Sequence, residues 1–162
     1  PPYIVNVGKF KQQKRHDVLI KAYAKANVQE KLVLVGTGEL LEASQRLVKE
    51  LGIEDKVVFT GFKKNPYPYM KHAKFMVLSS DFEGLGLVIL ESLALGTPVI
   101  STDCPSGPNE ILPSDCLVKP GDISALSDKI SAYSQQTDNN PVRLDRKFLP
   151  DYAASQYLDL II

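Results

Sequence analysis

The chain has 162 residues, enough for one domain with a substantial core, and its apolar fraction of 44% and charged fraction of 23% are ordinary for a globular protein. Lysine plus arginine and aspartate plus glutamate number 19 each, so the formal net charge is zero. A neutral chain has no overall field that would attract nucleic acid or an anionic membrane, which argues against both as general partners. Any anion binding must therefore be local.

Short apolar runs rich in Val and Ile alternate with helical patterns along the chain. Strands are expected at residues 3–7, 32–35, 57–60, 75–78 and 98–101, with a weaker one at 116–118. Helices are expected at residues 17–26, 40–51, 66–72, 87–95, 123–133 and 151–162. This alternation, with strands that are apolar on both faces, predicts an α/β domain with a doubly wound, Rossmann-like parallel sheet.

The first loop after a strand is strongly basic. Ligands of such sheets bind at the carboxyl ends of the strands, where helix N-termini present amide N–H groups. The loop GKFKQQKRHD places Lys9, Lys11, Lys14 and Arg15 at this edge, so a phosphate or diphosphate there would meet several cations. A solvated basic loop is the competing interpretation, since charge runs are commonly plain surface. The position at the sheet edge favours anion binding.

Other familiar sites are not indicated by the sequence. The loop GTGEL contains Gly36 and Gly38, but Leu41 stands where a dinucleotide fingerprint needs its third glycine, so a tight turn is the preferred interpretation. No Walker-type element is present. Cys104 has no neighbouring base in the sequence, and two histidines with two scattered cysteines make no metal-ligand pattern.

The segment EGLGLVILE places two carboxylates around the start of an apolar helix. Gly84 and Gly86 would let the backbone approach a ligand closely, beneath the helix that starts near Leu87. Glu91 then lies about one turn inside that helix. A buried, ionised carboxylate without partners costs several kcal/mol, so donors must face Glu91. Ribose hydroxyls and an internal Lys or backbone N–H are both open as those donors.

Six segments together resemble a known family. These are VGKFKQQKRHDVLIKAY, VGTGEL, VVFTGF, NPYPYMKHAKFMVLSS, EGLGLVILESLALGTPVIS and TDCPSGPNEIL. In this order they are similar to the C-terminal domain of retaining nucleotide-sugar glycosyltransferases of family 4 (group 1), which have the GT-B fold. The resemblance covers nearly the whole chain. It implies that residues 1–162 are a donor-binding domain, the C-terminal half of a longer chain whose N-terminal acceptor domain is absent.

The resemblance also implies roles for the matching residues. Lys9 and Lys14, where the family has Arg and then Lys, would clamp the donor diphosphate, and Glu83 would face the donor sugar; these three are the expected catalytic residues. Glu91 would hold the ribose hydroxyls. The other expected donor-binding residues are Gly61, Phe62 and Lys63 beside the base, and Gly84, Leu85, Gly86 and Leu87 near sugar and phosphate oxygens. Lys9 offers a point charge where Arg would offer a planar fork.

The implied activity is transfer of a hexosyl unit, with retention, from a nucleotide sugar to a glycan or lipid-linked acceptor held by the N-terminal domain. UDP is the expected nucleotide, and no metal or other cofactor is expected, because the lysines and the helix end would stabilise the leaving diphosphate. The segments NPYPY and DCPSGPNEI most resemble those of bacterial transferases that build capsule, lipopolysaccharide or other lipid-linked glycans. A cytoplasmic location follows, with peripheral association at the inner face of the plasma membrane as an option. The fragment alone is expected to bind donor weakly and to transfer nothing.

Two other interpretations remain open from the sequence. One is a sugar-phosphate synthase or phosphorylase of the same GT-B architecture, which would bind a phosphorylated acceptor or free phosphate. The other is a regulatory module that binds a nucleotide or sugar without catalysis. Nucleic-acid binding is disfavoured, because the net charge is zero and no stripe of basic and aromatic residues appears.

Overall fold

A single six-stranded sheet organises the domain. The computed structural model of the protein describes residues 1–83, 86–105 and 107–136. The strands are β1 (Tyr3–Val7), β2 (Lys31–Val35), β3 (Val57–Gly61), β4 (Phe75–Leu78), β5 (Val99–Thr102) and β6 (Leu117–Val118). Neighbouring strands pair in parallel in the order β3-β2-β1-β4-β5-β6. The predicted doubly wound parallel sheet is therefore confirmed.

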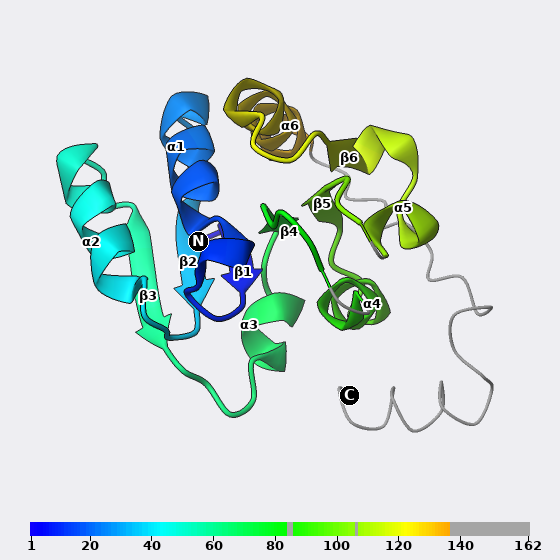
Figure 1. Ribbon diagram of the computed structural model, residues 1–162, viewed down its shortest axis with the longest axis horizontal. Helices are drawn as coiled ribbons and strands as arrows, with labels where there is room; N and C mark the ends of the chain where they lie inside the picture. Colours follow the sequence, from blue (N-terminus) through cyan, green and yellow to red (C-terminus); the bar gives the residue numbers. More distant parts are fainter. Residues whose placement is uncertain (84–85, 106, 137–162) are drawn as a thin grey trace.

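Helices cover both faces of the sheet. They are α1 (His16–Ala26), α2 (Leu41–Glu50), α3 (Tyr67–Lys71), α4 (Leu87–Ala94), α5 (Pro108–Ile111) and α6 (Ile123–Gln135). Figure 1 shows α1, α2 and α6 on one face and α3, α4 and α5 on the other. The expected elements are found with ends shifted by one or two residues, and the helix expected at 151–162 lies outside the described residues. None of the described helices has the length and apolar character needed to cross a bilayer.

The strands are mostly apolar on both faces, with a few polar residues such as Asn6 and Ser101, because the sheet separates two cores. Successive side chains of a strand point to opposite faces. Ile4 and Phe75 accordingly join the core beneath α1 and α6, whereas their neighbours Val5 and Met76 join the core beneath α3 and α4. All four of these side chains are fully buried. Continuous apolar runs, rather than alternating ones, are the result of this two-sided burial.

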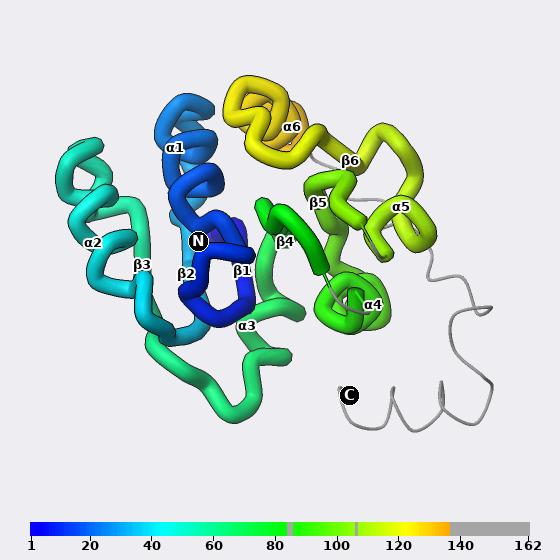
Figure 2. Tube along the Cα trace, in the orientation of Figure 1, coloured from blue at the N-terminus to red at the C-terminus, as the bar shows by residue number. Residues whose placement is uncertain are grey.

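The order of the strands reverses between β1 and β4. In Figure 2 the chain runs outward from β1 through β2 to β3, then returns to β4 on the other side of β1 and continues to β6. The loops that follow β1 and β4 consequently leave the same edge of the sheet in opposite directions. In sheets of this kind the crevice at such a reversal is where ligands bind.

Two glycines let the loops after β1 and β2 pack backbone against backbone. A Cβ on Gly36 would lie 2.1 Å from the carbonyl oxygen of Gly8, and one on Gly38 would lie 2.5 Å from that of Phe10. The amide of Phe10 also donates to the carbonyl of Thr37 at 3.0 Å. Gly36 and Gly38 therefore allow the two loops to come into close backbone contact at the edge of the sheet where the crevice lies.

A buried ion pair joins the opposite, amino-terminal edge of the sheet. The Nζ atom of Lys74, just before β4, lies 2.9 Å from Oε1 of Glu30, just before β2, and the hydroxyl of Ser134 donates to Oε2 of Glu30 at 2.6 Å. Only 5% of Glu30 is exposed. Burial acts to raise the pKa of Glu30, but the hydrogen bonds from Lys74 and Ser134 outweigh it and lower the pKa. This contact ties α6 to the sheet.

Replacing Lys74 with Ala is expected to reduce the free energy of unfolding by about 3 kcal/mol, because a buried carboxylate loses its charged partner. Urea titration at pH 7 measures this loss. Glu30 has a folded pKa below its ordinary 4.5, so its stabilisation is present above pH 4.5 and disappears as the pH falls through the folded pKa. Lys25→Ala is the control, because Lys25 bonds only to the exposed hydroxyl of Ser124 among the contacts described, and a change below about 0.5 kcal/mol is expected. Equal losses in the two variants would contradict the prediction.

Candidate functional site

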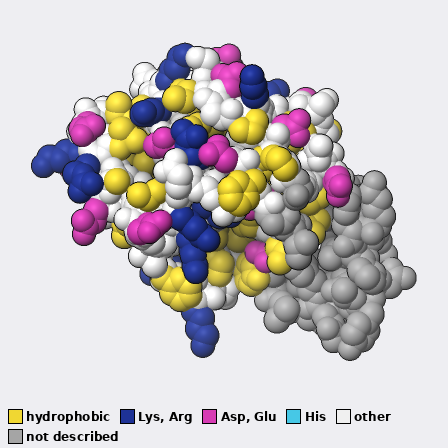
Figure 3. Space-filling model, in the orientation of Figure 1, with side chains coloured by type: hydrophobic (Ala, Val, Ile, Leu, Met, Phe, Trp, Pro, Cys, Tyr) yellow, Lys and Arg dark blue, Asp and Glu magenta, His cyan; other side chains and the backbone are white. Residues whose placement is uncertain are grey.

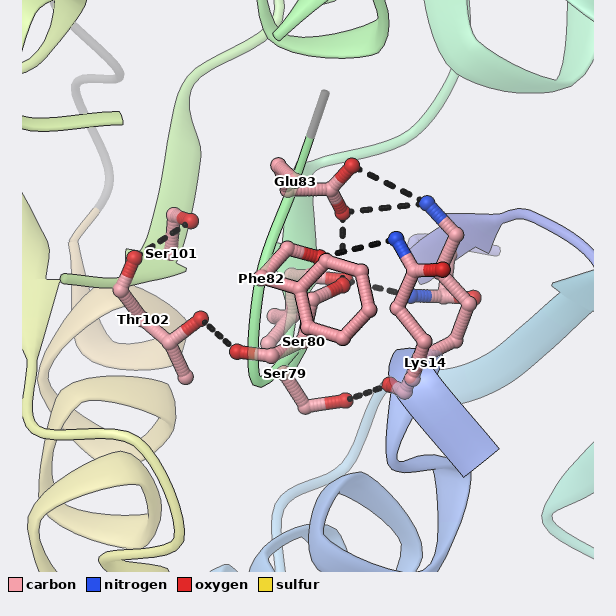
Figure 4. A network of polar contacts seen from close by, with 10 residues as sticks. Lys14, Ser79, Ser80, Phe82, Glu83, Ser101 and Thr102 are labelled. Carbon is pink, nitrogen blue, oxygen red and sulfur yellow. Dashed lines mark hydrogen bonds and ion pairs between the residues drawn. The ribbon is translucent and has the colours of Figure 1, made fainter. Parts of the chain in front are cut away.

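The loops after β1 and β4 are tied together by an ion pair at the reversal point. The Nζ atom of Lys14 lies 3.2 Å from Oε1 and 3.0 Å from Oε2 of Glu83 (Figure 4). The backbone joins the same two loops, since the amide of Asp81 donates to the carbonyl of Gln13 at 2.9 Å. Sequence analysis assigned Lys14 to the diphosphate and Glu83 to the sugar, and the structure brings the two side chains into direct contact.

The carboxylate of Glu83 has a second side-chain partner, Ser80, on the buried side of the site. Its residue is only 6% exposed, and the hydroxyl of Ser80 donates to Oε1 at 2.5 Å. The hydroxyl of Thr102, at the end of β5, donates to the carbonyl of Ser80 at 2.6 Å. Figure 4 shows Ser80 and Thr102 on neighbouring strand ends beneath the carboxylate. Sequence analysis missed both residues, and their only signal was their position at strand ends.

A cavity of about 310 Å³ opens at the carboxyl ends of β1, β2 and β3. Lys9, Phe62 and Lys63, three of the predicted site residues, line it together. The other lining residues are Val7, Gly8, Val35, Gly36, Thr37, Lys64 and Pro66. Phe62 is 72% exposed, an unusual state for a large aromatic side chain. The cavity therefore offers apolar walls with several ammonium groups, which suits a planar ring that is attached to an anionic group.

Gly8 lies next to both the cavity and the stem of Lys14. Gly8 lines the cavity, and a Cβ on it would lie 3.7 Å from Cδ of Lys14, so the stem of Lys14 runs beside this backbone. Lys14 therefore reaches from the cavity wall to Glu83. Sequence analysis also missed Lys64 and Thr37, which the loop positions after β3 and β2 could have suggested.

Glu91 has an internal donor that sequence analysis did not identify. The side chain lies half-buried on α4; burial raises its pKa, and the influence of the Tyr67 hydroxyl, at the start of α3, only partly offsets that rise. The internal donor is thus a tyrosine, and not the Lys or backbone N–H considered from the sequence. A carboxylate accepts more than one hydrogen bond, so Glu91 retains capacity for a further donor.

The start of α4 depends on Gly86. This residue adopts a φ of 65°, and its carbonyl accepts from the amides of Ile89 and Leu90. A Cβ there would also lie 3.0 Å from Cδ1 of Ile111 on α5. Gly86 therefore has a structural function at the helix start, and Leu87 beside it is 53% exposed. The predicted contacts at Gly84 and Leu85 lie outside the described residues, and Gly61 ends β3 beside the cavity.

His16 and the two free cysteines are unsuited to act as a general base or a nucleophile. His16 stacks on Phe10 at 3.9 Å, and burial, aided by the charge of Lys14, lowers its pKa to about 4. Burial raises the pKa of both free cysteines, Cys104 and Cys116, so their thiols stay protonated. The described residues contain no group of three or more His, Cys, Asp or Glu placed to hold a metal ion. Acidic and basic side chains are interspersed over the face in Figure 3.

Comparison with known proteins gives the family. A family model described as glycosyl transferases group 1 matches residues 1–147. The chain belongs to this family. Among curated group 1 relatives, a Campylobacter jejuni enzyme named N-acetylgalactosamine-N,N'-diacetylbacillosaminyl-diphospho-undecaprenol 4-alpha-N-acetylgalactosaminyltransferase is 42% identical over 113 residues, covering 70% of this chain and 31% of its own. The lipopolysaccharide 1,6-galactosyltransferase of Escherichia coli is 34% identical over 132 residues, covering 77% of this chain and 37% of its own.

The group 1 domain also matches solved structures over its whole length. The apo form of the lipopolysaccharide outer core galactosyltransferase WaaB superposes with a TM-score of 0.84 at 27% identity, covering 99% of this chain and 48% of that one. The fold is thus one half of a GT-B glycosyltransferase, as the resemblance implied. The chain spans about a third of the length of the two curated relatives, so its domain is one part of their architecture.

Proposed function

We propose that this domain binds the nucleotide-sugar donor of a retaining hexosyltransferase. The observation that carries the proposal is the placement of the lysine-lined cavity beside the Lys14–Glu83 ion pair, at the reversal point of a group 1 domain. An apolar pocket receives a base, and adjoining cations receive phosphates. The two features together would complement a nucleoside diphosphate with a sugar at its end, because the cavity takes the ring and the lysines take the negative charge.

The predicted charged and aromatic residues each have a role in this proposal. The cavity takes the base against Phe62 and Lys63, and Glu91 accepts the ribose hydroxyls. Lys9, Lys14 and the start of α4 hold the diphosphate and stabilise the charge that develops on it as the sugar departs. Glu83 accepts hydroxyls of the donor sugar. Positive charge from the lysines performs the stabilisation, so the proposed reaction needs no bound metal.

The acceptor is proposed to be a glycan or a lipid-linked glycan. The names of the two curated relatives specify transfer of N-acetylgalactosamine to an undecaprenol-linked sugar and of galactose to lipopolysaccharide. We propose that acceptor binding depends on a second, N-terminal GT-B domain, and that residues 1–162 alone bind donor without turnover. UDP is the nucleotide proposed for the donor.

Thermal stabilisation of the full-length protein tests this function. The panel comprises UDP-galactose, UDP-N-acetylgalactosamine and UDP-glucose, with GDP-mannose and ADP-glucose as competitors. A ligand that binds only the folded state raises the melting temperature, so UDP-sugars should give the largest increases. If no nucleotide sugar raises the melting temperature at millimolar concentration, the proposed function is wrong.

Replacing Glu91 with Ala is expected to weaken UDP binding about tenfold, since a hydrogen bond to a charged group contributes about 1.5 kcal/mol. Calorimetric titration of the full-length protein measures the affinity. Tyr67→Phe is the matched control, because it removes the internal donor and leaves the carboxylate available to ribose. Its UDP affinity should stay within about twofold of wild type. Equal weakening in both variants would show that Glu91 acts only through its bond with Tyr67.

A further inference from the structure

Glu83 sits in a cradle built from the ends of β4 and β5, made of Ser80, Thr102 and Cys104. Each of the three is 1% exposed. The Ser80 hydroxyl bonds Oε1 of Glu83 at 2.5 Å, and the Thr102 hydroxyl bonds the Ser80 carbonyl at 2.6 Å. The thiol of Cys104 lies close enough to the Thr102 side chain and the Glu83 backbone for both to act against the burial that raises its pKa. The cradle therefore holds the carboxylate of Glu83 through Ser80, which Thr102 holds in turn.

The two side-chain partners of the carboxylate differ in their surroundings. Lys14 approaches from the open side, with 21% of its side chain exposed, and its flexible stem lies beside the cavity. Ser80 approaches from the buried side, where Thr102 fixes the backbone that carries it. An incoming diphosphate competes for the ammonium group of Lys14, but it cannot reach the buried hydroxyl of Ser80. The bond from Ser80 is the one that persists when Lys14 turns toward phosphate.

We propose that Ser80 is a positioning residue that keeps the Glu83 carboxylate directed at the donor sugar once Lys14 has engaged the diphosphate, with Thr102 holding Ser80 in place. The inference rests on the proposed function, because it assigns Glu83 to the sugar. Ser79 acts elsewhere, since its hydroxyl lies 2.9 Å from the carbonyl oxygens of both Lys14 and Arg15 and so anchors the basic loop rather than the carboxylate. The effect of Ser80 should therefore appear only with ligands that carry a sugar.

The test compares UDP with the UDP-sugar of the panel above that binds the full-length wild type most tightly. Ser80→Ala should weaken binding of that UDP-sugar about tenfold and leave UDP affinity within about twofold. It should also lower kcat/KM for transfer by tenfold or more. In a Glu83→Ala background there is no carboxylate to position, so adding Ser80→Ala should change UDP-sugar affinity by less than about twofold.

Ser92→Ala is the matched control, because Ser92 is also fully buried and its hydroxyl makes one bond, 3.0 Å long, to the carbonyl of Thr97. Its affinities should equal those of wild type. If Ser80→Ala does not fold, Thr102→Val removes the second link of the cradle and should show the same selective loss for the UDP-sugar.

Three results would overturn the inference while leaving the proposed function intact. They are an unchanged UDP-sugar affinity in Ser80→Ala, an equal loss for UDP and UDP-sugar, and an additive loss in the Glu83→Ala background. A wild-type protein that binds no nucleotide sugar would instead remove the proposed function itself.

Discussion

Replacing Glu83 with Gln in the full-length protein is expected to lower sugar transfer by about 10²- to 10³-fold and to tighten UDP binding about threefold to tenfold. The loss of transfer follows from the loss of a charged group beside the reacting sugar. The gain for UDP follows from the ion pair, in which the carboxylate oxygens of Glu83 lie 3.0 Å and 3.2 Å from Nζ of Lys14. A neutral side chain leaves more of the lysine charge to the diphosphate.

Lys14 provides the control for this prediction. Lys14→Ala should weaken UDP binding about tenfold, since it removes a charged donor from the phosphates. Adding Glu83→Gln to Lys14→Ala should give little further tightening, because the ammonium group that the substitution releases is absent. Calorimetric titration with UDP measures all four proteins. Weaker UDP binding in Glu83→Gln alone would contradict the competition.

Replacing Gly36 with Ala is expected to reduce the free energy of unfolding by about 3–5 kcal/mol or to prevent folding. The added Cβ would lie 2.1 Å from the carbonyl oxygen of Gly8, and the φ of 140° at Gly36 is unfavourable for any residue with a side chain. Neither backbone can move away easily, because hydrogen bonds join Gly8 to Val35 and Gly36 to Gly61 at 3.0 Å. Urea titration of the variant measures the loss.

Gly52→Ala separates the steric effect from the conformational one. Gly52 has a φ of 69°, but a Cβ there would meet nothing within 4 Å. Its expected loss is therefore only the cost of the left-handed conformation, about 1–2 kcal/mol. Similar losses at the two positions would show that the backbones of the first two loops can separate. Gly36 also lines the cavity, so a folded Gly36→Ala protein should bind UDP less tightly.

The sequence by itself determined the layered sheet and the edge on which the site lies. The apolar runs at residues 3–7, 75–78 and 98–101 specify strands buried on both faces, because only a parallel sheet with helices on each side accommodates such runs. The basic residues after the first strand and the paired glutamates after the fourth then had to lie at the carboxyl edge. Chain direction alone places them there.

The partners of the site residues were decided by the tertiary structure. Lys14 and Glu83 are 69 positions apart, and local patterns carry no information on which cation meets which carboxylate across two loops. The pairing of Glu91 with Tyr67 likewise depends on how α3 packs beside α4. Arg15 adopts a left-handed φ of 48° although its sequence context predicts none, and the Ser79 hydroxyl bonds its carbonyl from the loop after β4. Periodicity reports the burial of a face, whereas side-chain pairing depends on the distances that packing sets between distant segments.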